Sequence, residues 1–167
     1  MKEIVIQPSA TADTRTCDFA TVSRATLLDA SRQHIDDVRA ALRLFATMLD
    51  DAAVIHDRDK VTAIDWFHAD FVTGFAQTGW WDNHRRIWRH HLAQEDGVPD
   101  NVNLLDVLEY IADCVMAGMA RSGSVRPLEI SDELLRRAFE NTATLLASSV
   151  RVESPDSAGT CDEKGAR

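Results

Sequence analysis

The chain has 167 residues, the usual size of one domain, and 45% of them are hydrophobic, which is too many for a disordered chain. Eighteen basic residues stand against 27 acidic ones, and the resulting net charge of −9 argues against non-specific binding to nucleic acid or to an anionic membrane. The sequence has neither an apolar run long enough to span a membrane nor a signal-peptide pattern, and its 3 widely spaced cysteines fit a reducing compartment. We therefore expect a cytoplasmic protein.

Glycine and proline are scarce, with 7 and 4 residues, so few turns can be built and long elements are favoured. This predicts an all-α fold, a single-domain helical bundle of about six helices over residues 21–152. Residues 1–20 mix apolar with small polar residues and are expected to form an N-terminal arm. Residues 153–167 are small and polar without periodicity, which predicts a disordered tail.

Apolar residues recurring at helical spacing, with turn and capping residues between them, divide the body into helices. Asn103 followed by Asp106 is a capping-box pattern, and Ser131 is a plausible cap of the last helix. The predicted helices cover residues 23–49, 51–55, 61–76, 81–93, 103–120 and 131–149.

The first predicted helix carries one histidine. At 100° per residue, His34 shares a face with Leu27 and Val38, and this predicts that its side chain points into the core. A buried histidine bonded to a carbonyl or carboxylate and a metal ligand are both compatible with that position.

In the stretch AVIHDRDK, His56 and Asp57 stand together at the end of an apolar run, and Lys60 follows shortly after them. A neutral imidazole nitrogen beside an anionic oxygen suits a divalent ion that keeps open positions for water. A histidine–aspartate pair alone is common by chance, but the inward histidine predicted upstream strengthens this interpretation.

The stretch HRRIWRHH is the one strongly basic segment of an acidic chain. Helical spacing puts His84 and His91 on the apolar face of the predicted helix and His90 about 100° away from His91. With Arg85 and Arg89 beside them, these histidines suit metal ligation or contacts to a small anion. A solvated basic face with packed histidines is the alternative.

Asp106, Glu109 and Asp113 form one narrow acidic stripe on an otherwise apolar helix. The stripe is either the solvent edge of a mostly buried helix or an internal wall. An internal wall of carboxylates needs cations beside it, because unpaired buried charges cost several kcal/mol each.

The order H…HD…HH…D, read in HDRDK, IWRHH and VNLLDVLEYIADC, resembles the HD-domain superfamily of metal-dependent phosphohydrolases. More closely, it looks like a small, uncharacterised HD-like family of bacteria and phages that carries HDxSK, NRHH and MNLIDLVEMxCDW. The resemblance covers about residues 30–120, and departs at Trp88, where that family has asparagine, and at Cys114, where it has an aromatic residue.

The resemblance implies an HD-domain-like fold and one divalent metal ion (Mn, Fe, Ni, Co or Mg), with a water molecule activated by the metal attacking phosphorus. The metal ligands implied are His34, His56, Asp57 and Asp113. The catalytic residues implied are Asp57, Lys60 and Glu109. The residues implied to bind the phosphate, or for the histidines a second metal, are His84, Arg85, Arg89, His90 and His91.

The function expected from this resemblance is hydrolysis of a nucleotide or a related small phosphate compound. An alternative is a non-catalytic protein that binds a nucleotide or another anion in the same cavity of histidines and arginines. A third possibility is a structural or regulatory helical protein whose histidines only pack. The expected partner is a small phosphorylated ligand, and a homodimer is possible.

Overall fold

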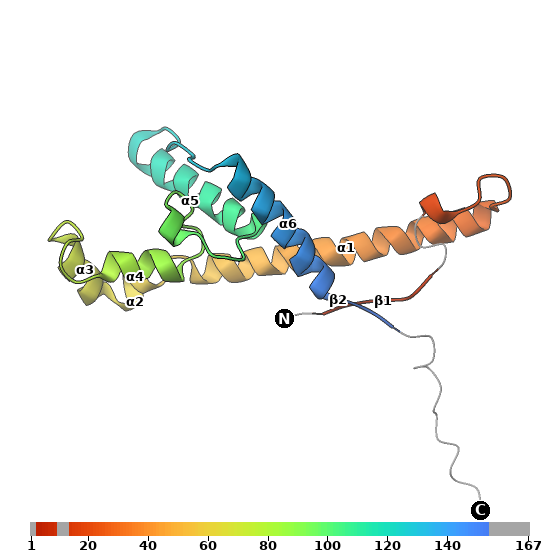
Figure 1. Cartoon of the computed structure of the whole chain (residues 1–167), viewed down its shortest axis with the longest axis horizontal. Coiled ribbons are helices and arrows are strands. Elements are labelled where there is room, and N and C mark those ends of the chain that lie inside the picture. The colour runs from red at the N-terminus through yellow and green to blue at the C-terminus, as the bar shows by residue number, and fades with distance from the viewer. Residues whose placement is uncertain (1–2, 10–13, 154–167) are drawn as a thin grey trace, which may run out of the picture. The chain divides into compact units, whose positions relative to one another are not determined.

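The computed structural model describes residues 3–9 and 14–153, and these are mostly helical (Figure 1). The helical class predicted from the sequence is therefore confirmed for the described chain, while the tail expected over 154–167 lies outside it. The elements in chain order are β1 (Ile4–Ile6), the 3-10 turn η1 (Thr14–Thr16), α1 (Arg24–Ile55), α2 (Asp59–Thr62), α3 (Ile64–Phe71), α4 (Trp80–Ile87), the 3-10 turn η2 (Glu95–Gly97), α5 (Leu104–Ser122), α6 (Asp132–Ser148) and β2 (Val150–Val152).

The chain divides into two compact units. The first comprises the described residues within Met1–Leu44 and Leu146–Arg167, and the second comprises Phe45–Leu145. In the first unit, β1 pairs with β2 in parallel, with Ile4 opposite Val150. This short strand pair joins the N-terminal arm to the last residues described. The expectation of one helical domain over 21–152 stays a prediction.

One continuous helix, α1, replaces the two helices predicted over residues 23–49 and 51–55. The predicted break before Asp51 is wrong, because no glycine or proline interrupts the chain there. Asp50 and Asp51 are both exposed, so their carboxylates remain in water and the helix continues through them. The helix begins as predicted, with Ser23 Oγ accepting from Thr26 N at 3.0 Å.

The face of α1 that carries His34 is exposed among the described residues. His34 is exposed, and so are Leu27 (41%) and Val38 (43%), with which it shares that face. The prediction that His34 points into the core is therefore wrong. Periodicity correctly grouped these three residues, but it does not tell whether another element packs against them.

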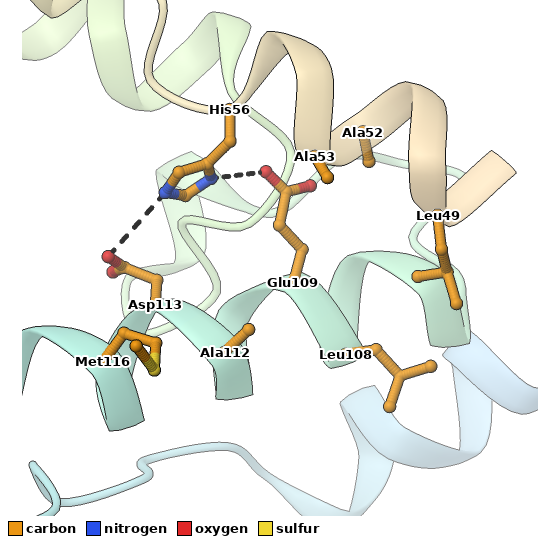
Figure 2. Close-up of a pocket in the computed structure, with 9 residues that line it drawn as sticks. All are labelled: Leu49, Ala52, Ala53, His56, Leu108, Glu109, Ala112, Asp113 and Met116. Atoms are coloured by element: carbon orange, nitrogen blue, oxygen red, sulfur yellow. Dashed lines mark hydrogen bonds and ion pairs between the residues drawn. The ribbon is translucent and has the colours of Figure 1, made fainter. Parts of the chain in front are cut away.

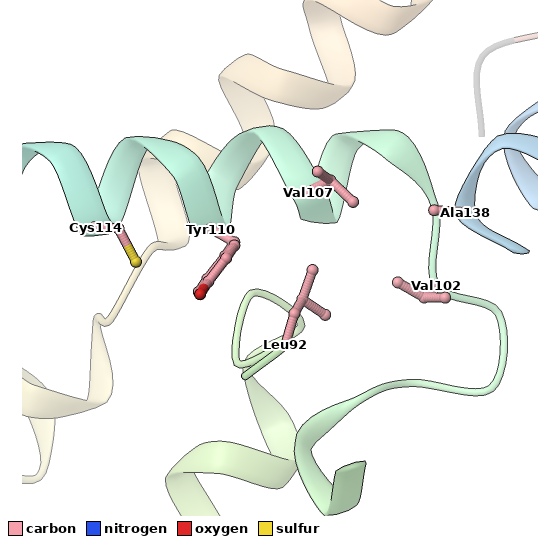
Figure 3. Close-up of a cluster of buried hydrophobic side chains, with 6 residues drawn as sticks. All are labelled: Leu92, Val102, Val107, Tyr110, Cys114 and Ala138. Carbon is pink, nitrogen blue, oxygen red and sulfur yellow. The ribbon is translucent and has the colours of Figure 1, made fainter. Parts of the chain in front are cut away.

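In the second unit, α5 is the most buried helix, and its start is specified by the predicted capping box. The Asn103 side chain accepts from Leu105 N at 2.8 Å and from Asp106 N at 3.4 Å, and Asp106 accepts from Asn103 N at 2.8 Å. The end of α1 faces α5 across the residues drawn in Figure 2. On its other side, α5 contributes Val107, Tyr110 and Cys114 to the buried apolar cluster (Figure 3). Because one side of α5 packs in this cluster, the carboxylates on its opposite side point toward the end of α1.

Helices α3 and α4 are shorter than predicted, and α4 ends at Ile87 rather than near residue 93. Trp88 is extended (ψ 120°), which terminates the helix. The loop between α3 and α4 is held by the fully buried Asp70, whose carboxylate accepts from Thr78 N at 2.7 Å and from Trp81 N at 3.0 Å. Among the helices in the described chain, none combines the length and apolar character needed to cross a membrane.

Candidate metal centre

The end of α1 places two functional side chains. His56 is the last residue to continue the helical pattern, with its N–H donating to Ala52 O at 2.9 Å. Asp57 then adopts a left-handed conformation with a φ of 51°. Only a few per cent of residues other than glycine adopt a positive φ, and such strain often marks a functional site. The turn separates α1 from α2 and directs the Asp57 carboxylate into the second unit's interior, where its side chain is 15% exposed.

Helix α5 presents Glu109 and Asp113 to His56 (Figure 2). His56 Nδ1 donates to Glu109 Oε1 at 2.8 Å, which leaves Nε2 facing two other carboxylates. His56 Nε2 lies 3.9 Å from Asp113 Oδ1 and 3.6 Å from Asp57 Oδ2. One imidazole and three carboxylates therefore meet at the end of α1.

Helix α4 contributes His84, which is fully buried. Its Nδ1 donates to the two oxygens of Asp59, at 2.8 and 3.1 Å, and Trp88 Nε1 donates to the same carboxylate at 2.6 Å. The ring stacks on Trp80, with 4.5 Å between centroids. These contacts fix the orientation of the His84 ring, so that its Nε2 faces Asp57.

His90 and His91 follow α4 in a turn and are not helical. The prediction that His84 and His91 lie on one face of the same helix is therefore wrong. The turn still brings both rings beside His84. His90 is 1% exposed, with its ring 4.5 Å from that of His56, and the His91 ring lies 4.7 Å from that of His84. His90, expected to turn away from His91, therefore points into the same cluster.

Asp57 Oδ1 is the point on which these rings converge. It lies 3.3 Å from His84 Nε2 and 3.5 Å from His90 Nε2. Within the described chain, these three buried atoms and His91 Nε2 make no hydrogen bond. His90 Nδ1 lies 3.0 Å from Glu109 Oε1 but, like its Nε2, makes no hydrogen bond among the described residues. Buried nitrogen and oxygen atoms therefore face one another without a hydrogen bond between them.

The charges of the cluster are set by its surroundings. Burial acts to raise the pKa of Asp57, but contact with His84 and with the Lys60 ammonium outweighs it and holds the pKa well below its usual range. Burial and repulsion from His90 and His84 lower the pKa of His91 to about 3, so this ring is neutral at pH 7. The cluster thus offers an anionic oxygen and a neutral imidazole lone pair, the forms that bind metals.

A divalent cation fits this donor set. Buried acceptors that face one another are costly unless a positive charge lies between them. Nitrogen and carboxylate oxygen ligands are those of zinc and the other first-row divalent ions. The groups of candidate ligands whose atoms lie within 4.8 Å of one another are Asp57 with His84 and His91, His56 with Asp57 and Asp113, and His56 with His90 and Glu109.

Of the predicted metal ligands, the structure brings together His56, Asp57 and Asp113. His34 is exposed and belongs to the first unit, and among the described residues no group of candidate ligands contains it. Of the two alternatives left open for the acidic stripe, the internal wall describes Asp106 and Glu109, whereas the side chain of Asp113 is 36% exposed. Glu109 contacts two histidines, and the buried Asp106 contacts an arginine.

The predicted cationic residues have different surroundings. Lys60 Nζ is paired with Asp57 Oδ2. Arg85 donates to Asp82 and Asp96, both at 2.8 Å, and lines a cavity of about 110 Å³ with His90, His91 and Asp113. Arg89 binds both oxygens of Asp106 at 2.7 and 2.8 Å and donates to Asn101. Arg89 therefore holds the start of α5, and we assign it this structural role.

One residue of the site was missed by the sequence analysis. Asp59 orients His84, and a signal for it was present in the second aspartate of HDRDK. Comparisons of this chain with protein-family models, with curated proteins and with solved structures found no match.

Proposed function

We propose that the protein is a metal-dependent phosphohydrolase that acts on a nucleotide or a related small phosphate compound. The observation that carries the proposal is the convergence of His84 Nε2 and His90 Nε2 on Asp57 Oδ1 at 3.3 and 3.5 Å, where all three atoms are buried and make no hydrogen bond among the described residues. The sequence resemblance to the HD-domain superfamily supports the reaction class.

In this proposal, Asp57 is the central ligand, with His56, His84, His91 and Asp113 around it. A divalent ion bound there supplies a Lewis acid that lowers the pKa of a bound water molecule and polarises the phosphoryl group. Glu109 holds the rings of His56 and His90 through their Nδ1 atoms.

The same residues supply the remaining roles. Burial acts to raise the pKa of Glu109, but contacts with His90 and His56 outweigh it, and the lowered pKa keeps this carboxylate ionised, so that it can orient a water molecule as an acceptor. Arg85 and His91 line the small cavity beside the cluster and supply donors for phosphate oxygens. Lys60 balances the charge of Asp57.

The proposal includes a cytoplasmic setting, which is supported by Cys17 and Cys114, both free among the described residues. Binding of a nucleotide or another anion without turnover is a second candidate. It is supported by Arg85 and His91, which line the small cavity and suit an anion whether or not that anion is hydrolysed.

The test is release of inorganic phosphate from a panel of nucleotides and phosphomonoesters, with Mn²⁺, Ni²⁺, Co²⁺, Fe²⁺ or Mg²⁺ present. We expect turnover with at least one of these ions and a loss of at least about 100-fold in Asp57→Asn, since loss of even an outer partner of a ligand costs roughly 10- to 100-fold. Tight nucleotide binding without turnover under every ion would favour the second candidate instead.

A further inference from the structure

We propose that an apolar groove beside His56 binds the uncharged part of the substrate, which identifies the substrate class as an organic phosphate with an apolar alkyl or aryl group. This inference rests on the proposed function. The groove lies between the last turns of α1 and the middle of α5, within the second unit, and has a volume of about 340 Å³.

The walls of the groove are apolar and come from both helices. In Figure 2, His56, Glu109 and Asp113 turn toward one another at one end, and Leu49 and Leu108 lie toward the other. The apolar residues of the lining are Leu49, Ala52, Ala53, Leu108, Ala112 and Met116. Three of these are alanines, whose small side chains leave space between the two helices.

The charges of the residues that line the groove determine which chemical groups can bind there. Neither lysine nor arginine is among the residues that line the groove, and its only ionisable side chains are His56, Glu109 and Asp113. A second phosphate group placed there would lose its hydration and meet two carboxylates. An alkyl or aryl group would instead remove apolar surface from water.

The groove continues into the site through Asp113. This residue also lines the cavity of about 110 Å³ on the side of His90, His91 and Arg85. A ligand with its phosphate in the small cavity and its ester group in the groove therefore passes the carboxylate cluster. The two cavities are complementary in chemistry, since one offers cationic and imidazole donors and the other only apolar contacts.

The experiment measures binding of methyl-, butyl- and octylphosphonate, whose C–P bond is not hydrolysed, to the full chain with Mn²⁺ by titration calorimetry. We expect affinity to rise with chain length, by up to roughly fourfold for each methylene that is fully buried. The rise stops when the groove is filled.

The variant that tests the groove is Ala112→Leu. Ala112 is exposed on α5, and leucine is a good helix former, so the fold is expected to tolerate it. We expect affinity for octylphosphonate to fall at least tenfold and affinity for methylphosphonate to be unchanged. Ala53→Leu fills the groove from α1 and should have the same effect. Ala120→Leu is the matched control, because Ala120 is exposed on the same helix but does not line the groove.

Phosphate release from octyl and ethyl phosphate separates this inference from the proposed function. Affinity that rises with length and falls in Ala112→Leu supports the groove, even when no phosphate is released under any ion, a result that would contradict the hydrolase. If phosphate is released but affinity does not depend on chain length, the groove proposal is overturned and the hydrolase proposal stands. The same holds if phosphate is released and octylphosphonate binds Ala112→Leu as tightly as the unmodified chain. Failure of every phosphonate to bind overturns the groove as well.

Discussion

At the scale of single residues, the orientation of His84 depends on a carboxylate that is not itself a candidate ligand. Asp59 accepts from His84 Nδ1 at 2.8 Å and from Trp88 Nε1 at 2.6 Å, so it is held from two sides. A hydrogen bond on one ring nitrogen fixes which nitrogen carries the lone pair and makes that nitrogen more basic. Asp59 is therefore a positioning residue for the metal centre.

We expect Asp59→Asn to lower the affinity for Mn²⁺ by roughly 10- to 100-fold, as loss of such a partner does at other histidine-bound metals. The variant keeps an acceptor oxygen for His84 but removes the negative charge. Calorimetric titration with Mn²⁺ measures the change. Asp65→Asn, at an exposed position in the first turn of α3, is the control and should bind as the unmodified chain does. Equal affinity in both variants would contradict the role given to Asp59.

The site residues that could be placed from the sequence are those that lie close together in it. His56, Asp57 and Lys60 could be predicted because neighbours at a helix end necessarily lie together. His34 could not be placed, because whether a helix face is covered depends on elements distant in the sequence. The ion pair between Arg89 and Asp106 could not be predicted either, because the sequence shows which residues are charged but not which of them are in contact.

At the scale of elements, the segment after α4 that carries His90 and His91 is held by packing rather than by helical hydrogen bonds. Gly97 in η2 is buried against it, and a Cβ at Gly97 would lie 2.3 Å from His91 O. Leu92, which is 3% exposed, anchors the segment in the apolar cluster. Only glycine allows η2 to approach the His91 backbone this closely.

We expect Gly97→Ala to displace the His91 segment and to weaken Mn²⁺ binding at least tenfold, together with a loss of unfolding free energy. Gly74→Ala is the control: its φ of 69° strains alanine by about 1–2 kcal/mol, but its Cβ would meet nothing within 4 Å. Chemical denaturation and metal titration of both variants separate stability from site geometry. If Gly74→Ala weakened metal binding as much as Gly97→Ala, the specific contact would not explain the effect.

The loop between α3 and α4 gives a prediction about pH. Burial acts to raise the pKa of Asp70, but the N–H groups of Trp81 and Thr78 outweigh it and hold the pKa below its usual value. A depressed pKa in the folded state stabilises the protein above the unfolded-state value of about 3.9, and this stabilisation is lost as pH falls through the folded pKa.

We therefore expect Asp70→Asn to lower the free energy of unfolding at pH 7, measured by urea denaturation. The difference from the unmodified chain should shrink as pH falls below about 4, because Asp70 takes up its proton first in the unfolded chain and, at lower pH, in the folded chain as well. Asp65→Asn should show little difference at either pH. A difference for Asp70→Asn that stayed constant down to pH 2 would contradict this assignment.

Element boundaries were predictable where a local signal exists. The capping box of Asn103 and Asp106 marked the start of α5 correctly. The end of α4 was missed because Trp88 and Arg89 continue a helical pattern that the tertiary structure interrupts, with Trp88 Nε1 reaching Asp59. The union of the first two predicted helices into α1 shows that two acidic residues do not break a helix.

At the scale of the whole molecule, the net charge of −9 is distributed unevenly. In the second unit, three carboxylates, those of Asp57, Glu109 and Asp113, lie within one cluster of histidine rings. Such a cluster attracts a divalent cation, and burial strengthens that attraction. The scarcity of glycine and proline, together with helical periodicity, predicted the helical class, whereas the way the helices pack needed the structure.

The most direct test of this account is the amount of Mn²⁺ bound per chain, measured by elemental analysis after equilibrium dialysis of the unmodified chain and Asp57→Asn. Asparagine tolerates the left-handed φ of 51° at this position, so the backbone is preserved while the central ligand loses its charge. We predict at least one Mn²⁺ per unmodified chain and almost none in a folded Asp57→Asn. No Mn²⁺ in the unmodified chain, or equal amounts in both, would contradict a metal centre built on Asp57.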